Sequence, residues 1–512
     1  MATIDQQAMY ETARAEKPFP VVGVALGIAA SAVIAAVGTY FGYLLVVALV
    51  LLVIVLAAAF ARPEVATLVV FFALYSNLAV ILVRQGLPTG LAGGVFLLLG
   101  LPLLNNLFIK HRGLVITPVF IVMIAYLGVL VFSAAMADRP KPSYERITSY
   151  VLEGLLLYFL VVNTVRSHEL LRKAIWVVLL AGMAMGSVTL YQGLTGAYDN
   201  DFGGWATVTQ SQTSIGEEDF LGNQPMVPRL AGPIGEKNRY AQIMVVLLPL
   251  AIGRIWAERS FRLRALAAIM IVPIVGGALL TFSRGAGFGL LVTLAALMVV
   301  RMVPVRYVLL LAVIVGVVGV GLVPGYLYRI SNVNISDILA GNLEESDTSV
   351  QGRMTQYLTA IVMIRDNPVF GVGPGQASRY IVEYARGIGY KVLDTNRRTH
   401  NMYLEEMADT GLVGFSVLMG IIGLTMVQLA SMRARFRLLR PDISYTAASF
   451  MLSIIAYLAT AVFLHLAYMR YFWFLLALSG AAIAVWTAMI EVAPPRRNPL
   501  SQALAEPADT QI

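Results

Sequence analysis

The chain has 512 residues, of which 58% are hydrophobic and only 13% are charged, with a formal net charge of +8. Soluble domains carry about 25% charged residues, so this composition excludes a soluble protein and predicts an integral membrane protein. The chain has no cysteine, which excludes a disulfide framework, a zinc–thiolate site, an iron–sulfur cluster and a cysteine nucleophile. Lys and Arg are scattered between apolar runs, which argues against nucleic-acid binding.

Fourteen apolar runs are long enough to cross a membrane, since a spanning helix needs about 20 mostly apolar residues. We therefore expect an all-α membrane protein with about 14 transmembrane helices, in a range of 12–14. The first run follows a polar start and is interpreted as a spanning helix, not a cleaved signal peptide. The runs lie near 20–38, 42–60, 65–83, 90–108, 114–136, 148–165, 173–193, 239–256, 265–282, 285–301, 306–327, 402–430, 444–467 and 471–490.

The distribution of cations between these runs predicts the orientation. With the N-terminus in the cytoplasm, 20 of the 37 Lys and Arg residues fall on the cytoplasmic side, and most of the others fall in two long outer loops. Short loops follow the positive-inside rule and long loops follow it poorly. We expect a multi-pass protein of the bacterial inner membrane with both termini in the cytoplasm and the two long loops in the periplasm.

This topology divides the chain into seven segments, from a cytoplasmic N-terminal segment to a disordered cytoplasmic tail. Between them lie transmembrane helices in three groups and two periplasmic loops, the second with an amphipathic helix. The expected segments are 1–19 (N-terminal), 20–194 (transmembrane), 195–238 (periplasmic loop), 239–327 (transmembrane, with a Ser-Arg-Gly motif), 328–401 (long periplasmic loop), 402–490 (transmembrane) and 491–512 (tail).

The long loop 328–401 contains a predicted helix over 350–366 that Asn367-Pro368 ends. Its apolar stripe is interpreted as packing on the protein's own helices, with a position on the lipid surface as the alternative. The glycine run at 371–375 lacks the context of a phosphate loop and predicts a packed turn. The stripe consists of Met354, Tyr357, Leu358, Ile361 and Val362.

Among four histidines, His400 is the best candidate for chemistry. It precedes a spanning helix, with Glu405, Glu406 and Asp409 in the next turns, and an imidazole near carboxylates at a membrane boundary suits general-base work. Capping of the helix start is the alternative. The other three are interpreted as structural: His111 and His168 in solvated loops, and His465 in a hydrogen bond between helices, where a functional role stays open.

Cations near the outer surface are the second group of candidates. Arg284 lies in Thr281-Phe282-Ser283-Arg284-Gly285-Ala286 between two apolar runs, where a charge needs a carboxylate, a backbone carbonyl or a phosphate as partner. The segment 228–239 brings Arg229, Lys237 and Arg239 to a helix N-terminus, which is itself an anion site, with Asn238 as the expected N-cap. A charged rim that anchors the helix at the interface is the alternative.

In this order, these segments resemble the O-antigen ligase/polymerase family of bacterial envelope glycosyltransferases, from about residue 225 to 415. Two motifs depart from the family pattern, because Glu236-Lys237-Asn238 stands where Asn-Pro-Asn is usual, and Asp409 where Glu is usual. The motifs are Arg229…Gly232…Asn238…Ala241, then Ser283-Arg284-Gly285-Ala286, then Gly352-Arg353 with Asn367-Pro368…Gly371-Val372-Gly373, and His400-Asn401…Leu404…Asp409…Gly411.

The resemblance implies transfer of a glycan from undecaprenyl diphosphate to an acceptor hydroxyl, on lipid A–core or a growing glycan, without a metal, cofactor or nucleotide sugar. By motif, His400 would be the general base, and Arg284 and Arg229 would hold the diphosphate leaving group. Further phosphate or glycan contacts would come from Arg353, Lys237 and Arg239, and orienting roles would fall to Asn401, Glu405 and Asp409.

Two functions of other classes remain open. A transporter or flippase of an amphipathic anion would use the arginines as counter-charges, although we find no internal repeat of the kind typical of alternating access. A structural scaffold in an envelope complex would use the apolar stripe of 354–362 as a docking face.

Overall fold

The computed structural model describes residues 62–88, 90, 94–137, 140–209, 228–322, 348–386, 399–464 and 469–491. The expected segment 1–19, the spans at 20–38 and 42–60, His465 and the tail after Glu491 lie outside these residues. The chain divides into two compact units, Met1–Ala66 and Thr67–Ile512. The packing described below is that of the second unit.

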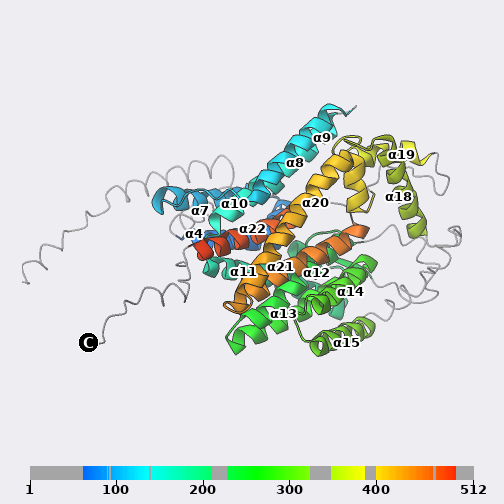
Figure 1. Cartoon of the computed structure of the whole chain (residues 1–512). Helices are drawn as coiled ribbons and strands as arrows, with labels where there is room; N and C mark the ends of the chain where they lie inside the picture. Colours follow the sequence, from blue (N-terminus) through cyan, green and yellow to red (C-terminus); the bar gives the residue numbers. More distant parts are fainter. Residues whose placement is uncertain are drawn as a thin grey trace, which may run out of the picture. The chain divides into compact units, whose positions relative to one another are not determined.

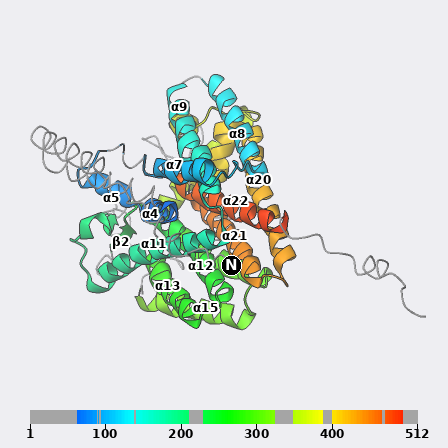
Figure 2. The same ribbon diagram turned by 90° about the vertical axis from the view of Figure 1, so that its left-hand side faces the viewer.

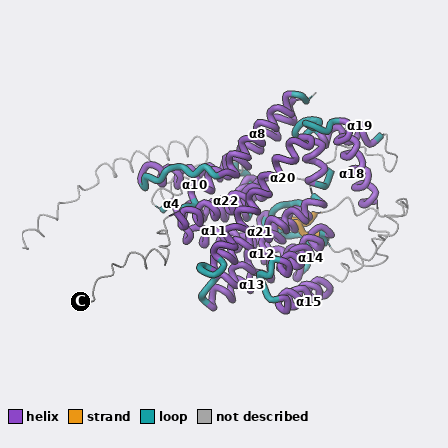
Figure 3. Tube along the Cα trace, in the orientation of Figure 1, coloured by secondary structure: helices purple, strands orange, loops and turns teal. Residues whose placement is uncertain are grey.

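Helices dominate the described part of the chain (Figure 3). In the first half they are α4 (Pro63–Tyr75), α5 (Leu78–Arg84), η1 (Val95–Leu99), α7 (Gly100–Leu104), η2 (Asn105–Ile109), α8 (Pro118–Ala135), α9 (Pro140–Ser149), η3 (Tyr150–Leu156), α10 (Leu157–Thr164), α11 (His168–Thr195) and η4 (Phe202–Gly204). After strands β1 (Thr207–Thr209) and β2 (Arg229–Gly232) come α12 (Lys237–Ala257), α13 (Phe261–Leu279), α14 (Arg284–Val299), α15 (Val305–Leu322), α18 (Thr348–Asp366), α19 (Ala377–Ala385), α20 (Met402–Phe436), α21 (Pro441–Thr460), η7 (Ala461–Phe463) and α22 (Met469–Glu491).

Several helices begin where a short polar side chain caps the first turn. The hydroxyl of Thr117 accepts from the amide of Phe120 before α8, and that of Ser167 accepts from Leu170 in α11. Such caps satisfy amides that have no partner inside the helix. The all-α expectation is confirmed, with the two-stranded antiparallel pair β1–β2 as an addition between α11 and α12.

Among the described residues, eight helices are long and apolar enough to cross a membrane, or nine if the bent pair α4 and α5 forms one span. The fourteen expected spans are therefore not confirmed. The run 65–83 bends by 63° between these two helices, where Asn77 has a left-handed φ of 61°. The runs at 90–108 and 285–301 correspond to shorter apolar helices, Val95–Ile109 and Arg284–Val299.

Helix α12 lies at the centre of the bundle and is buried along most of its length. It packs against α21, α13, α14 and α11. Figure 1 shows these helices together, and Figure 2 shows α11, α12, α13 and α21 from another side. Helix α20 packs against α21 and α8, and α22 packs against α10. Because four helices surround α12, apolar residues occur around most of its circumference and its sequence is almost continuously hydrophobic.

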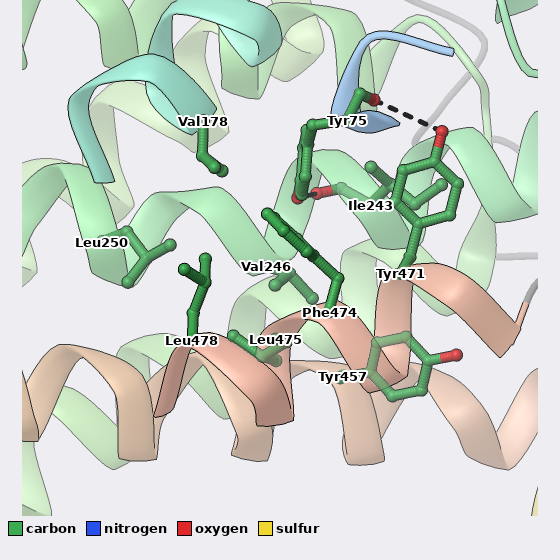
Figure 4. A pocket seen from close by; sticks show the side chains of 10 residues that line it. All are labelled: Tyr75, Val178, Ile243, Val246, Leu250, Tyr457, Tyr471, Phe474, Leu475 and Leu478. Carbon is green, nitrogen blue, oxygen red and sulfur yellow. Dashed lines mark hydrogen bonds between the residues drawn. The ribbon is translucent and has the colours of Figure 1, made fainter. Parts of the chain in front are cut away.

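A small apolar crevice lies where α4, α11, α12, α21 and α22 meet, and Figure 4 shows its lining. Tyrosine hydroxyls on its rim join three of these helices. Tyr471 in α22 donates to the carbonyl of Tyr75 in α4 (3.3 Å), and the hydroxyl of Tyr75 donates to the carbonyl of Ile243 in α12 (3.0 Å). The crevice therefore lies inside a hydrogen-bonded joint between α4, α12 and α22.

The bundle has two ends that differ in their contacts. At one end, which we call the motif end, α12, α14 and α20 begin and α21 ends, since Gln242 donates to Thr460 (2.9 Å) and Phe288 packs on Phe463. At the opposite end α12 finishes and α21 begins, since Arg254 donates to Thr446. His168 also lies at this opposite end. Its interpretation as a solvated loop residue is wrong, because its Nε2 lies 3.2 Å from a carboxylate oxygen of Asp442.

The predicted helix of the long loop is confirmed as α18, which lies with α19 beside the first turns of α20 (Figure 1). The apolar stripe is partly covered. Ile361 is 50% exposed, the other four stripe residues are partly buried, and Tyr357 donates to the carbonyl of Val462 in η7 (3.0 Å). Packing of the stripe on the protein's own helices and its position on the lipid surface both stay predictions. The face that is buried carries Thr355, Gln356, Thr359, Ala360 and Met363.

Candidate active site

The segment from β2 to α12 reaches the motif end through a tight turn. The carboxylate of Glu236 caps α12, because it accepts hydrogen bonds from the amides of Asn238 (3.0 Å) and Arg239 (2.7 Å). The expectation that Asn238 is the N-cap is therefore wrong. Two of the amides that would make this helix start an anion site already bind a carboxylate, so anion binding here depends on side chains.

Arg229 connects this segment to the Ser-Arg-Gly motif. Its Nε donates to the carbonyl of Thr281 (2.9 Å), and its Nη2 donates to the carbonyl of Phe282 (3.1 Å). Asn238 is a third, longer partner at 3.4 Å. The guanidinium thus lies against the turn between α13 and α14, directly before Arg284, and the first two motifs are brought together.

Arg284 is the first residue of α14 and is half-buried. Ser283 caps the helix through its hydroxyl, which accepts from the amide of Ala286 (3.4 Å), and Phe282 before it has a left-handed φ of 53°. The turn is closed from the other side by η7, because Gly285 has Phe463 so close that an added Cβ would lie 3.2 Å from it. Arg284 therefore projects from a fixed helix start at the motif end.

The other two cations of the entry segment lie deeper. Arg239 is only 1% exposed, and its Nη1 donates to the side chain of Gln242 (2.7 Å). Gln242 in turn donates to Thr460 at the end of α21. Lys237 is also buried. The structure thus places Arg239 between α12 and α21, beneath the surface to which Arg229 and Arg284 belong.

His400 lies two residues before α20, with a left-handed φ of 51° and partial exposure. The helix is capped by the next residue, because the side-chain oxygen of Asn401 accepts from the amides of Tyr403 (2.9 Å) and Leu404 (3.1 Å). The alternative that His400 caps the helix is therefore wrong. Asn401 fixes the chain on one side of His400, and so holds the position from which the imidazole projects.

Tyr357 in α18 joins His400 to η7. Its hydroxyl donates to the carbonyl of Val462 (3.0 Å) and lies 3.5 Å from the carbonyl of His400. Burial raises the pKa of Tyr357, and the nearby charge of Arg353 and a hydrogen bond with Asn401 oppose this effect only in part. Tyr357 therefore stays protonated and able to donate, and Arg353, one turn earlier, lies in the same neighbourhood.

The carboxylates that follow His400 face the bundle instead of solvent. Glu405, Glu406 and Asp409 are 5%, 2% and 1% exposed. Tyr126 of α8 donates to Glu406, and the guanidinium of Arg146 in α9 lies 3.6 Å from the Glu406 carboxylate. These contacts join α20 to α8 and α9 next to the site.

Asp409 holds the glycine run of the long loop. Its two carboxylate oxygens accept from the amides of Gly375 (2.9 Å) and Ala377 (2.8 Å), the second of which begins α19. Backbone bonds from Val372 to Ala408 and from Gly373 to Asp409 complete the contact. The predicted packed turn is confirmed, and Asp409 binds the segment between α18 and α19.

Three residues of this region were not predicted. The sequence places Tyr357 in the apolar stripe and Glu236 in a motif that departs from the family pattern, and it assigns no role to Arg146. Tyr357 could have been noticed as a phenol in an otherwise aliphatic stripe. Arg146 could have been noticed as a cation at the outer start of a predicted span. Among the described residues, no cluster of three or more His, Asp or Glu side chains is arranged to hold a metal ion.

Comparison with known proteins agrees with this geometry. Residues 269–419 match the model of the family described as O-Antigen ligase, a stretch that begins in α13 and includes Arg284, Arg353, His400 and Asp409. No curated protein matches the chain. The chain is a multi-pass membrane protein with many apolar helices. Residues 269–419 thus carry the O-antigen ligase domain, and the family resemblance expected from the sequence motifs is confirmed.

Proposed function

We propose that the protein transfers a glycan from a polyprenyl diphosphate, undecaprenyl diphosphate in a bacterium, to an acceptor hydroxyl on the periplasmic side. The family match implies ligation or polymerisation of lipid-linked glycans. The match also favours an enzyme over the transporter and the scaffold. We further propose that both termini lie in the cytoplasm, so that the motif end faces the periplasm.

In this proposal His400 is the general base. It takes the proton of the acceptor hydroxyl while the hydroxyl oxygen attacks the anomeric carbon and the bond from that carbon to the diphosphate oxygen breaks. The departing diphosphate gains negative charge, which Arg284 stabilises through its planar guanidinium. Arg229 contributes through its positive charge, because its Nε and Nη2 already donate to backbone carbonyls. Arg353 acts as a further phosphate or glycan contact. Lys237 and Arg239 reinforce the positive potential from within the bundle.

One observation carries the proposal: segments distant in sequence meet around η7. Val462 accepts from Tyr357, whose hydroxyl also lies beside the His400 carbonyl, and Phe463 packs against the start of α14 that bears Arg284. Displacement at an anomeric carbon requires a base on one side and a cation beside the leaving group. A base candidate and a cation candidate next to one short segment suit that requirement.

Ligase and polymerase differ only in the acceptor. A ligase adds the glycan to lipid A–core, whereas a polymerase adds it to another lipid-linked glycan. Of the two, we propose a polymerase or an exopolysaccharide enzyme.

The test uses the purified full-length protein with an undecaprenyl-diphosphate glycan, with and without lipid A–core. A ladder of lengthened glycans identifies a polymerase, and a single shift that requires lipid A–core identifies a ligase. No product under either condition, with protein that remains folded, would contradict the enzyme proposal. Tracer flux into proteoliposomes that contain no acceptor would instead support the transporter.

A further inference from the structure

The turn from Gly232 to Glu236 joins the two cation-bearing parts of the entry segment. Arg229 lies just before it in β2, and Lys237 and Arg239 lie just after it in α12. Gly232 has a φ of 52°, and an added Cβ there would lie 2.6 Å from the ring of Tyr240. Gly235 also has a positive φ, of 82°. Because glycine has the largest backbone freedom to lose, this turn needs contacts from outside to hold one conformation.

Two side chains from elsewhere in the chain supply those contacts. The hydroxyl of Thr207 in β1 donates to the carbonyl of Gly232 (2.6 Å), and the amide of Asn77 donates to the carbonyl of Pro233 (2.8 Å). Asn77 is 3% exposed and comes from the break between α4 and α5. Two consecutive carbonyls are therefore held from two directions, and we call Asn77 and Thr207 the turn clamp.

The orientation of the Asn77 amide is set by a cation. Arg470, at the start of α22, donates through Nη2 to the side-chain oxygen of Asn77. Since a guanidinium only donates, the oxygen of the amide must face Arg470, and its NH2 group then faces Pro233. Asparagine also tolerates the left-handed backbone required at this break. The hydrogen bond from Tyr471 to the Tyr75 carbonyl, shown in Figure 4, lies close by in the sequence. Tyr471 follows Arg470, and Tyr75 lies two residues before Asn77.

One end of the clamped turn leads to Arg229, a cation of the proposed diphosphate site, and the other leads to the start of α12. Arg229, three residues before Gly232, reaches the Thr281 and Phe282 carbonyls next to Arg284. Glu236, directly after the turn, caps α12 and fixes the start of its first turn. A displacement of the turn would therefore move Arg229 relative to Arg284, and small misplacements of binding groups weaken interactions with a bound ligand markedly.

We infer that Asn77 and Thr207 are positioning residues for the diphosphate of the lipid-linked donor. Neither side chain touches the donor in this inference, and each acts through the turn that places Arg229 and the start of α12. The inference rests on the proposed function. It differs from a merely structural role, because it assigns the effect of the clamp to donor affinity and not only to stability.

The experiment measures the Kd for undecaprenyl diphosphate and the Tm of the purified full-length protein. Asn77→Gly removes the amide but keeps the left-handed backbone, and Thr207→Val removes the hydroxyl at nearly constant shape. The matched control is Asn106→Ala. Asn106 is also a buried asparagine that donates to a backbone carbonyl, that of Asn163 (3.1 Å), but it lies away from the motif end.

We expect each clamp variant to raise the Kd about fivefold, the order of one lost neutral hydrogen bond, while Asn106→Ala lowers the Tm and leaves the Kd unchanged. The inference would be overturned if the Kd stayed unchanged in both clamp variants and rose in Arg284→Ala. That result would leave the proposed function intact. Unchanged binding in Arg284→Ala as well would overturn the diphosphate site itself. If Asn77→Gly does not fold, Thr207→Val tests the same turn from its other side.

Discussion

At the motif end of the bundle Arg229 is bonded to two backbone carbonyls and an amide, whereas at the opposite end Arg172 and Arg254 are bonded to the carboxylate of Glu258. The opposite end repeats this pattern at Asp442, which accepts from Arg440 (2.9 Å) and pairs with His168. Opposite charges in contact neutralise each other. A carbonyl holds a guanidinium in place and leaves its positive charge.

This difference separates Arg229 from the charge pairs of the opposite end, although a charge pair, Arg146 with Glu406, also lies next to the site. Charge pairs across helices at the opposite end join α11, α12 and α21, so their loss is expected to reduce stability. Bonds at the motif end fix the direction of a cation that an anionic ligand can still attract. Variants at the two ends should therefore separate into those that lower activity and those that lower Tm.

The largest effect is expected for His400→Ala. Loss of a general base reduces the rate by about 10²–10⁴-fold, so glycan transfer should fall by that order while the Tm stays close to that of the wild type. Transfer from the undecaprenyl-diphosphate glycan is the measurement. The matched control is His168→Ala at the opposite end, which should keep full transfer. Undiminished transfer in folded His400→Ala would show that the assigned base is wrong.

Arg284→Ala should have the second largest effect. Removing one donor to developing charge costs about 10²–10³-fold in rate, and Arg284→Lys should recover only part of this loss because an ammonium lacks the planar fork. The readout is kcat and KM for the lipid-linked donor. Equal rates for Arg284→Lys and the wild type would show that the position needs charge alone, and equal rates for all three proteins would remove Arg284 from the site.

A stability effect is expected at the opposite end for Glu258→Gln. Breaking a buried ion pair costs about 3–5 kcal/mol, and we expect about 2 kcal/mol here because the Arg172 side chain is 41% exposed and partly screened. Transfer activity of the folded protein should not change. A loss of activity without a loss of Tm would contradict the division between the two ends.

The same variant has a pH signature. Burial alone raises the pKa of Glu258, but hydrogen bonds from Arg172 and Trp176 and the charge of Arg254 outweigh burial and hold the pKa below its ordinary value. A depressed carboxyl pKa contributes stability that is complete above the unfolded-state pKa and is lost as pH falls through the folded-state pKa. The Tm difference between wild type and Glu258→Gln should therefore shrink in acid.

The smallest effect is expected for Asn401→Ala, which removes the cap of α20. Loss of such a cap costs about 1 kcal/mol, and the transfer rate should fall modestly because His400 is adjacent. Asn401→Ser keeps an acceptor for the same amides and should restore both the Tm and the rate. A rate that stays low in Asn401→Ser, at a restored Tm, would assign Asn401 a role beyond capping.

The sequence predicts a helix correctly where a single apolar run is long and uninterrupted. The apolar runs that became α8, α11, α12, α20 and α22 are long and uninterrupted, so the hydrophobic pattern alone indicates a spanning helix. The sequence predicts one span over 65–83, because the residues around Asn77 carry no proline or glycine that would indicate a bend. That asparagine is fixed by Pro233 and Arg470, which lie far away in the sequence.

The site was predictable as a set of residues but not as an arrangement. His400, Arg284 and Arg229 follow from type, spacing and membrane placement, whereas the bonds of Arg229 to Thr281 and Phe282 depend on a long-range approach. The choice between Glu236 and Asn238 as N-cap also lies outside local rules, because both are polar and the path of the turn decides it. The most deeply buried positions of α18 combine Thr355, Gln356 and Thr359 with Ala360 and Met363, so the apolar stripe does not mark them.

The contact between the glycine run and α20 has a consequence for motion during turnover. An added Cβ at Gly371 would lie 2.4 Å from the backbone of Asp409, and one at Gly411 would lie 2.2 Å from the backbone of Val369. The two segments therefore touch through their main chains. Close-packed backbones slide little and shift as a unit. We therefore expect the segment around Gly371 to move together with the first turns of α20 and not separately from them.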